Sequence, residues 1–270
     1  MQLAYQVATP EVSNADVTAY RGDLRTAFAR LSELGYHAVE LMVRDPSRVD
    51  ASQMAALAAE FKLPVVLVCT GEVFGEDGLS FTDPSAAVRA EARRRVRAAV
   101  ELAARLGADC NIGRVRGRLR SDVPRPVALS WGRAGILEAA DLAAARGIRV
   151  LIEPLNRQIA NWGVGTAAGL ALLRELAHPA LQLMLDLGHL WVEGERPAEA
   201  FAAAREYLRY VHVCDHHRLA PGAGRLNFQE VIDALRSVGY NGVVSVEAYQ
   251  QPNSDTVMRQ SAAVLLPLLR

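Results

Sequence analysis

The chain has 270 residues, of which 51% are hydrophobic and 22% are charged, and its 30 basic residues balance 30 acidic ones. This composition is that of an ordinary globular domain, and the neutral balance argues against a general nucleic-acid-binding protein, which would carry a basic excess. The N-terminus has no basic segment followed by a long apolar one, and no apolar run reaches the roughly 20 residues of a membrane span. We therefore expect neither a secretory signal nor a membrane protein. Three scattered cysteines without a CxxC pair predict a reducing, cytoplasmic location.

Short β-rich segments alternate with longer Ala-, Leu- and Arg-rich stretches at helical spacing, which is typical of a parallel sheet built from strand–helix units. The predicted strands are 2–7, 38–43, 64–69, 108–113, 149–154, 181–186, 210–215 and 243–248. The predicted helices are 22–34, 50–61, 85–106, 131–146, 165–177, 197–207, 227–238 and 254–269. Four of these helices are followed by a glycine that can end a helix in the left-handed conformation: Gly35, Gly107, Gly147 and Gly239.

Strict alternation of eight strands with eight helices predicts an α/β fold of the (β/α)8 (TIM) barrel type. A doubly wound open sheet is the alternative, but the first strand is not followed by the GxGxxG phosphate-binding turn that would favour it. No linker, charge block or low-complexity tract divides the chain. We therefore expect a single domain over residues 1–270.

Four consecutive predicted strands carry a carboxylate or an imidazole at or near their carboxyl ends, at the edge where a (β/α)8 barrel has its active site. These residues are Glu153, Asp186, His212 and Glu247. Three buried carboxylates at one spot need a compensating cation. Oxygen and imidazole ligands without a thiolate favour Mn²⁺, with Mg²⁺ and Co²⁺ as alternatives, over a structural Zn²⁺. Strand-end hydrogen bonds or salt bridges to helix arginines would explain any one of these residues, but not four in succession.

The segment after the fourth predicted strand carries four arginines, and arginine suits bidentate recognition of phosphate or carboxylate. Arg114 and Arg116 are therefore candidates for binding an anionic group of a substrate, and an interface or solvated loop is the alternative. Glu40, at the end of the second strand, is expected to point to the same rim and to contact the substrate or support a ligand. The long loop 70–84 is either a lid or a packed surface loop.

The motifs around these residues resemble the xylose-isomerase-like sugar isomerase/epimerase superfamily, and among its members the ketose 3-epimerases (D-tagatose and D-psicose type) and the hydroxypyruvate isomerases. The motifs that carry the resemblance are EPLNR at 153–157, DLGH at 186–189, VHVCD at 211–215, PGAGRLNF at 221–228 and VE at 246–247. The resemblance covers almost the whole chain and is less specific for the substrate than for the superfamily. It also implies a homo-oligomer, either a dimer or a tetramer.

Residue roles follow from this resemblance. It implies that the metal is held by Glu153, Asp186, His212 and Glu247. It further implies that Glu153 and Glu247 transfer protons, and that His189 and Arg218 contact substrate oxygens. One position departs from the 3-epimerases, which usually carry a second acidic residue six positions after the first glutamate, where this chain has Ile159. A contact with a substrate hydroxyl is therefore missing or replaced.

The implied activity is metal-dependent epimerisation or isomerisation of a small sugar or sugar phosphate. A glutamate removes a proton next to a ketone to give a cis-enediolate, and the position to which the proton returns decides between the two outcomes. We favour a ketose 3-epimerase. The alternatives are a hydroxypyruvate-type isomerase and a metal-dependent lyase that dehydrates a keto-inositol-like substrate. An endonuclease IV-like phosphodiesterase is disfavoured because its zinc cluster needs histidines where this chain has Cys69 and Asn111.

Overall fold

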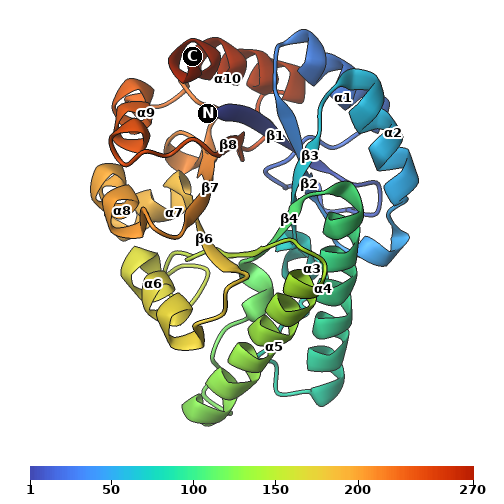
Figure 1. Ribbon diagram of the computed structural model, residues 1–270, viewed down its shortest axis with the longest axis vertical. Helices are drawn as coiled ribbons and strands as arrows, with labels where there is room; N and C mark the ends of the chain where they lie inside the picture. The colour runs from blue at the N-terminus through green and yellow to red at the C-terminus, as the bar shows by residue number, and fades with distance from the viewer.

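A computed structural model describes residues 1–270, and in it eight parallel strands close into a barrel in chain order. The last strand pairs with the first, and the helices surround the barrel (Figure 1). The predicted (β/α)8 architecture is confirmed. None of the helices combines the length and apolar character needed to cross a bilayer.

The eight strands are β1 (Gln2–Ala8), β2 (Ala38–Met42), β3 (Val65–Cys69), β4 (Asp109–Ile112), β5 (Val150–Ile152), β6 (Leu181–Asp186), β7 (Leu208–Val213) and β8 (Val243–Val246). The helices are α1 (Leu24–Glu33), α2 (Ala51–Phe61), α3 (Gly71–Gly75), α4 (Ala86–Leu106), α5 (Arg125–Ala145), α6 (Gly165–Leu176), α7 (Leu187–Glu193), α8 (Pro197–Ala204), α9 (Phe228–Ser237) and α10 (Ser254–Leu269). Three short 3₁₀ turns are η1 (Pro46–Arg48), η2 (Arg114–Arg116) and η3 (His216–Arg218).

Every predicted strand and helix is present. The largest difference in bounds is at α5, which begins at Arg125 rather than at residue 131, because Pro126 fits the first turn of a helix. The short helices α3 and α7 were not expected from the sequence. The four glycines predicted to end helices all have φ between +69° and +82°, which confirms their role.

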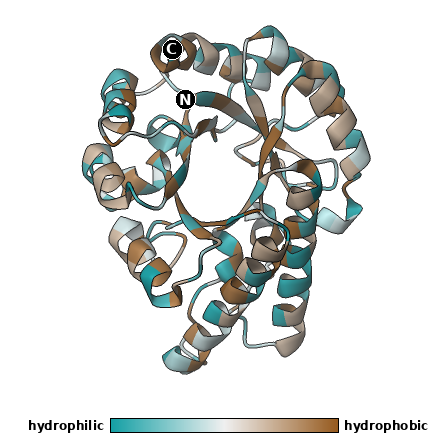
Figure 2. Cartoon of the chain, viewed as in Figure 1, coloured by the Kyte–Doolittle hydropathy of each residue, from teal (hydrophilic) through white to brown (hydrophobic).

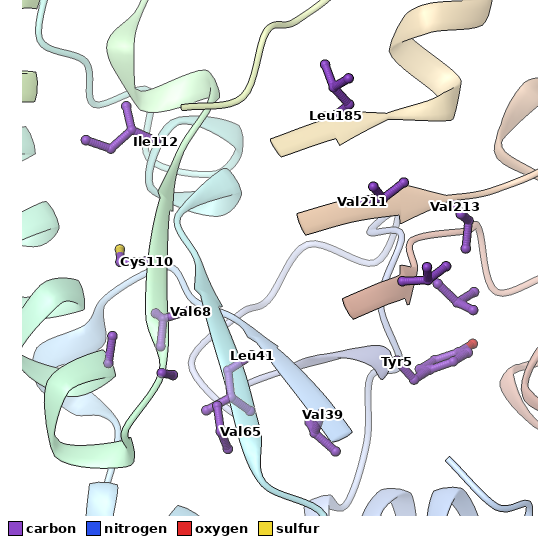
Figure 3. Close-up of a cluster of buried hydrophobic side chains, with 14 of the residues drawn as sticks. Tyr5, Val39, Leu41, Val65, Val68, Cys110, Ile112, Leu185, Val211 and Val213 are labelled. Atoms are coloured by element: carbon purple, nitrogen blue, oxygen red, sulfur yellow. The ribbon is translucent and has the colours of Figure 1, made fainter. Parts of the chain in front are cut away.

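Side chains alternate along each strand between the barrel interior and the surrounding helices. Those on the outer face form a core of 65 buried residues together with the inner faces of the helices. Figure 3 shows part of this core, including Val211 and Val213 of β7 and Val39 and Leu41 of β2. In Figure 2 the strands are largely hydrophobic, whereas the helices carry hydrophobic and hydrophilic residues side by side. The alternation of buried side chains between the two faces of each strand fixes the register of the strand, because a shift by one residue would exchange the faces.

The alternate positions face the interior of the barrel. A small apolar cluster, Leu67, Leu151, Met184 and Tyr210, fills this interior. Two residues after Tyr210 on the same strand, His212 points to the same side, toward the carboxyl end of the barrel. A shift of one residue in the strand would turn the imidazole out toward the helices. The core therefore determines which polar side chains reach the interior.

Candidate active site

Four predicted ligands converge at the carboxyl end of the barrel. One ligand atom each from Glu153, Asp186, His212 and Glu247 lies within 4.8 Å of all the others. Asp186 and His212 lie in neighbouring strands β6 and β7, and Glu153 and Glu247 directly follow β5 and β8. The Nδ1 atom of His212 is 3.6 Å from the carboxylate of Glu153, 3.6 Å from that of Asp186 and 3.2 Å from that of Glu247.

The environment of His212 fits a divalent metal ion. Its Nδ1 atom is buried and makes no hydrogen bond, although three carboxylates surround it. Burial lowers the pKa of His212, but the charges of Glu40 and Glu247 outweigh burial and hold the pKa well above its usual value. The cluster thus attracts positive charge to this spot. A metal ion bound there would replace the proton on Nδ1 and accept the nitrogen as a ligand.

Glu40 was expected to point to the rim and either contact the substrate or support a ligand. The structure places it inside the barrel, below the cluster, which agrees with the second alternative. The residue is fully buried, and its carboxylate accepts hydrogen bonds from Gln6 Nε2 at 2.8 Å and the Tyr210 hydroxyl at 3.0 Å. His212 Nε2 lies 2.9 Å from both of its oxygens. Burial opposes the charge of Glu40, but the charge of His212 outweighs it and lowers the pKa of the carboxyl group. Glu40 therefore orients His212 and has no access to a substrate.

Arg218 and His189 lie beside the carboxylates. The Arg218 Nη1 atom is 2.7 Å from Glu247 Oε2 and 3.0 Å from Asp186 Oδ2. Burial raises the pKa of Asp186, but the charge of Arg218 outweighs it and holds the pKa well below its usual value. Burial raises the pKa of Glu247 despite the same guanidinium. Arg218 has a φ of +56°, which is rare outside glycine and indicates that its backbone is held by the surrounding loop.

His189 is oriented by a neighbouring amide. The Asn156 Nδ2 atom lies 2.9 Å from His189 Nδ1, so the amide donates there and the ring proton of the neutral imidazole sits on Nε2. Burial lowers the pKa of His189, which favours this neutral form. The Nε2 atom is 3.7 Å from Glu153 and 3.4 Å from Arg218 Nη2. His189 thus presents a hydrogen-bond donor beside the cluster.

A cavity of about 260 Å³ lies above the cluster and is lined by 16 residues. Its wall includes Glu153, His189, Arg218 and Glu247, which were predicted from the sequence. Ile159 also lines the cavity and presents an apolar side chain where the 3-epimerases were expected to carry an acid.

Two further parts of the site were missed in the sequence. Thr18, in the loop after β1, lines the cavity and donates a hydrogen bond to Glu247 Oε1 at 3.1 Å. No motif pointed to this threonine. Gly113 approaches Glu153 so closely that a Cβ atom there would lie 2.4 Å from Glu153 Oε2. Gly113 directly follows β4 at the carboxyl end of the barrel, and this position could have identified it as part of the site.

The two arginines predicted to bind an anionic group lie in different places. Arg114 lines the cavity and pairs with Glu72, which the sequence did not identify. Arg116 does not line the cavity, so the structure does not place it where the substrate contact was expected. It is fully buried, and its guanidinium donates to the carbonyl oxygens of Glu153 at 2.6 Å and Gly163 at 2.9 Å. Burial lowers the pKa of Arg116 to about 10. Its contacts indicate that it holds the backbone of Glu153 in place.

Known proteins share both the sequence pattern and the fold. The family described as xylose isomerase-like TIM barrel matches residues 28–268. The L-ribulose 3-epimerase of Methylomonas sp. (strain DH-1) is 29% identical over 248 residues, which are 89% of this chain and 83% of that protein. A Xenopus laevis protein provisionally named a hydroxypyruvate isomerase is 28% identical over 254 residues, which are 90% of this chain and 88% of that protein.

A solved structure supports the same assignment of the fold. The D-psicose 3-epimerase of Clostridium cellulolyticum H10, determined with D-tagatose, superposes with a TM-score of 0.81 at 18% sequence identity, and the alignment covers 100% of both chains. The family match and the curated ketose 3-epimerases among the relatives confirm the predicted family and enzyme class. The chain belongs to the xylose isomerase-like TIM-barrel family and is an isomerase.

Proposed function

We propose that this protein is a divalent-metal-dependent ketose 3-epimerase. The observation that carries the proposal is the buried Nδ1 atom of His212, which faces three carboxylates at the floor of an open cavity. Its sequence relatives named L-ribulose 3-epimerase and ketose 3-epimerase support the type of reaction. The resemblance to this family also underlies our proposal that the protein is a homodimer or homotetramer. The three scattered cysteines underlie our proposal that it acts in the cytoplasm.

The residues that would hold the metal are Glu153, Asp186, His212 and Glu247. These oxygen and imidazole ligands favour Mn²⁺, with Mg²⁺ and Co²⁺ as alternatives. When bound, the ion would polarise the ketone of the substrate and acidify the neighbouring C–H bond. Glu40 keeps the Nδ1 lone pair of His212 directed at the ligand position by accepting the proton of Nε2.

Proton transfer is the task of the two glutamates that line the cavity. One carboxylate, of Glu153 or Glu247, removes the proton on C3, and the carboxylic acid of the other returns a proton to the opposite face. The carbon is thereby inverted, and exchange with solvent restores both carboxyl groups. His189 and Arg218 stand beside these glutamates and donate hydrogen bonds to the substrate oxygens that gain negative charge when the proton is removed.

A hydroxypyruvate-type isomerase is the second candidate. The observation in its favour is the Xenopus laevis relative, of which 88% aligns with this chain. The same residues would serve this reaction, since only the return of the proton to the neighbouring carbon differs.

Product analysis tests the proposal. The purified protein is incubated with Mn²⁺ and either D-tagatose, D-psicose, L-ribulose or hydroxypyruvate, and the products are separated by chromatography. We expect the C3 epimer of at least one ketose. Aldose or aldehyde products alone would favour the second candidate, and products lighter by one water would indicate a lyase, so either result would overturn the epimerase assignment.

A further inference from the structure

We propose that Glu72 and Arg114 form an ion pair that binds the substrate hydroxyl farthest from the ketone. The pair would select substrates at the end remote from Glu247. This inference rests on the proposed function for the identity of the reacting end. Of the two residues, the sequence analysis identified only Arg114, and it predicted that Arg114 binds an anionic group.

The pair lies across the cavity from the proposed metal ligands of β7 and β8. Glu72 belongs to α3, directly after β3, and Arg114 begins η2, directly after β4. In a closed barrel that runs in order from β1 to β8, β3 and β4 lie opposite β7 and β8. Both side chains line the cavity that also contains Glu153 and Glu247. A substrate whose ketone lies beside His212 and Glu247 would extend toward this wall.

The pair is held in place by its neighbours. Arg114 Nη1 is 3.3 Å from Glu72 Oε1, and Asn14 Nδ2 donates to Glu72 Oε2 at 3.0 Å. The Arg114 guanidinium carbon lies 5.7 Å from the centre of the Phe74 ring. A Cβ atom at Gly75 would lie 2.5 Å from Glu72 Oε1 and 2.8 Å from Arg114 Nη1, so the pair packs closely against this glycine. These contacts favour the paired arrangement before a substrate arrives.

The pair keeps free capacity to donate and accept hydrogen bonds. Each Glu72 oxygen accepts one of the hydrogen bonds above, whereas a carboxylate offers about four acceptor positions. The guanidinium of Arg114 has about five N–H groups, and its one side-chain hydrogen bond goes to Glu72. The side chain of Arg114 is 37% exposed and that of Glu72 only 4%, but both line the cavity, so a substrate would approach the pair from the side of the arginine. A hydroxyl group can donate to Glu72 and accept from Arg114 at once, and it suits the pair for that reason.

Charge disfavours the anionic group that the sequence suggested for Arg114. Glu72 already compensates the charge of Arg114, and a phosphate bound to the arginine would meet the carboxylate beside it. The cavity wall also carries Asp16, Glu153 and Glu247. An uncharged hydroxyl avoids this repulsion, and it is the group that we assign to the pair.

The test compares three substrates that differ only at the far end: D-tagatose, 6-deoxy-D-tagatose and D-tagatose 6-phosphate. Binding in the presence of Mn²⁺ is measured by calorimetry, and turnover is measured as kcat/KM. We expect the wild-type protein to prefer D-tagatose over both analogues by at least about tenfold, because a site built for a hydroxyl rejects analogues that lack it. Glu72→Gln and Arg114→Gln should each reduce the preference over the deoxy analogue to about threefold or less.

A matched control pair lies between β4 and α5, in the same connection that carries Arg114. Arg120 and Asp122 form an exposed ion pair that does not line the cavity, so Arg120→Gln and Asp122→Asn should leave the preference unchanged. Equal binding and turnover of D-tagatose and its deoxy analogue by the wild-type protein would overturn the inference, whether or not the variants fold. Preference for the phosphate would overturn it as well. Selective binding of D-tagatose without epimerisation of any ketose would instead overturn the proposed function and leave the role of the pair supported.

Discussion

Within the site, the two nitrogens of His212 have different tasks. Nε2 bonds to Glu40 inside the barrel, and Nδ1 faces the carboxylates at the floor of the cavity. Metal-binding histidines in proteins are commonly oriented by a carboxylate in this way. The sequence places a carboxylate at position 40 near the rim, but it does not show that the side chain reaches His212, because the two residues lie 172 positions apart.

Removing the charge of Glu40 should weaken metal binding. Glu40→Gln keeps the size of the side chain but loses the carboxylate that holds the Nε2 proton, and we expect Mn²⁺ affinity to fall about 10- to 100-fold. Calorimetric titration with Mn²⁺ at fixed pH measures the change. Glu60→Gln is the control, since Glu60 pairs with Arg25 on the surface. Unchanged affinity in Glu40→Gln would contradict the proposed role.

Loss of one proton-transfer group should stop the reaction without unfolding the protein. We expect Glu247→Gln to abolish deuterium exchange next to the ketone, because an amide cannot accept or return the proton. Circular dichroism and Tm establish whether the variant is folded. Turnover at the wild-type rate would rule out Glu247 as a proton-transfer residue.

The arginines after β4 show that the direction of a side chain in a loop cannot be inferred from the sequence. Arg114 and Arg116 are two positions apart in the same short turn, η2, yet one lines the cavity and the other is buried behind Glu153. The sequence shows two equivalent cations in a glycine-containing loop. The direction of each depends on the φ and ψ angles of Gly113 and Gly117, which no periodic pattern encodes. Their placement could therefore not be predicted.

At the scale of elements, the segment after β3 is packed against the barrel through ion pairs. Asp77 lies 2.7 Å from Arg44 Nη2, in the loop after β2, and 3.0 Å from Arg95 Nη1 on α4. Of the two possibilities for loop 70–84, a packed surface loop agrees with these contacts. They also hold the segment that carries Glu72 against its neighbours. The sequence could predict the length of this loop, but not the partners on two other elements.

Lowering the pH should weaken the ion pairs that Asp77 forms with Arg44 and Arg95. Hydrogen bonds from Arg44 lower the pKa of Asp77 from its ordinary value of 3.8. A carboxyl group whose pKa is lower in the folded state stabilises the protein above the unfolded pKa, and this contribution disappears as the pH falls through the folded pKa. Asp77→Asn should therefore lower the free energy of unfolding by about 1 kcal/mol at neutral pH, and by less below about pH 4.

Urea unfolding at several pH values measures this difference, with Asp122→Asn as an exposed control. A difference between wild type and Asp77→Asn that stays constant from neutral pH to about pH 3 would contradict the proposed linkage.

Across the whole molecule, the fold could be predicted because the same strand–helix signal occurs eight times in the chain. Each unit has a short apolar segment, a longer helical pattern and in several cases a glycine between them, so the order of elements follows from local sequence. The four proposed ligands could be predicted for the same reason, since each lies at the end of such a segment. Glu72, Thr18 and Asn156 could not, because their roles depend on loops whose conformations are set by tertiary contacts.

Metal binding should stabilise the entire barrel, since the four ligands come together only in the folded chain. Mn²⁺ at about 100 times its Kd should add about 2.7 kcal/mol to the free energy of unfolding. For a domain of this size, that corresponds to a rise in Tm of about 5–10 °C. Thermal unfolding with Mn²⁺ and then with EDTA measures the shift, and Asp186→Asn should reduce it. An unchanged Tm would argue against a metal site.

The most direct test is an NMR measurement of ketoses incubated with the protein in D₂O, with Mn²⁺ and then with EDTA. We predict deuterium incorporation at C3 in the presence of Mn²⁺, together with appearance of the C3 epimer, and loss of both on addition of EDTA. Glu247→Gln serves as the matched inactive variant. Absence of deuterium at C3 of every ketose, while calorimetry shows that Mn²⁺ is bound, would contradict the proposal that these carboxylates carry out proton transfer next to a ketone.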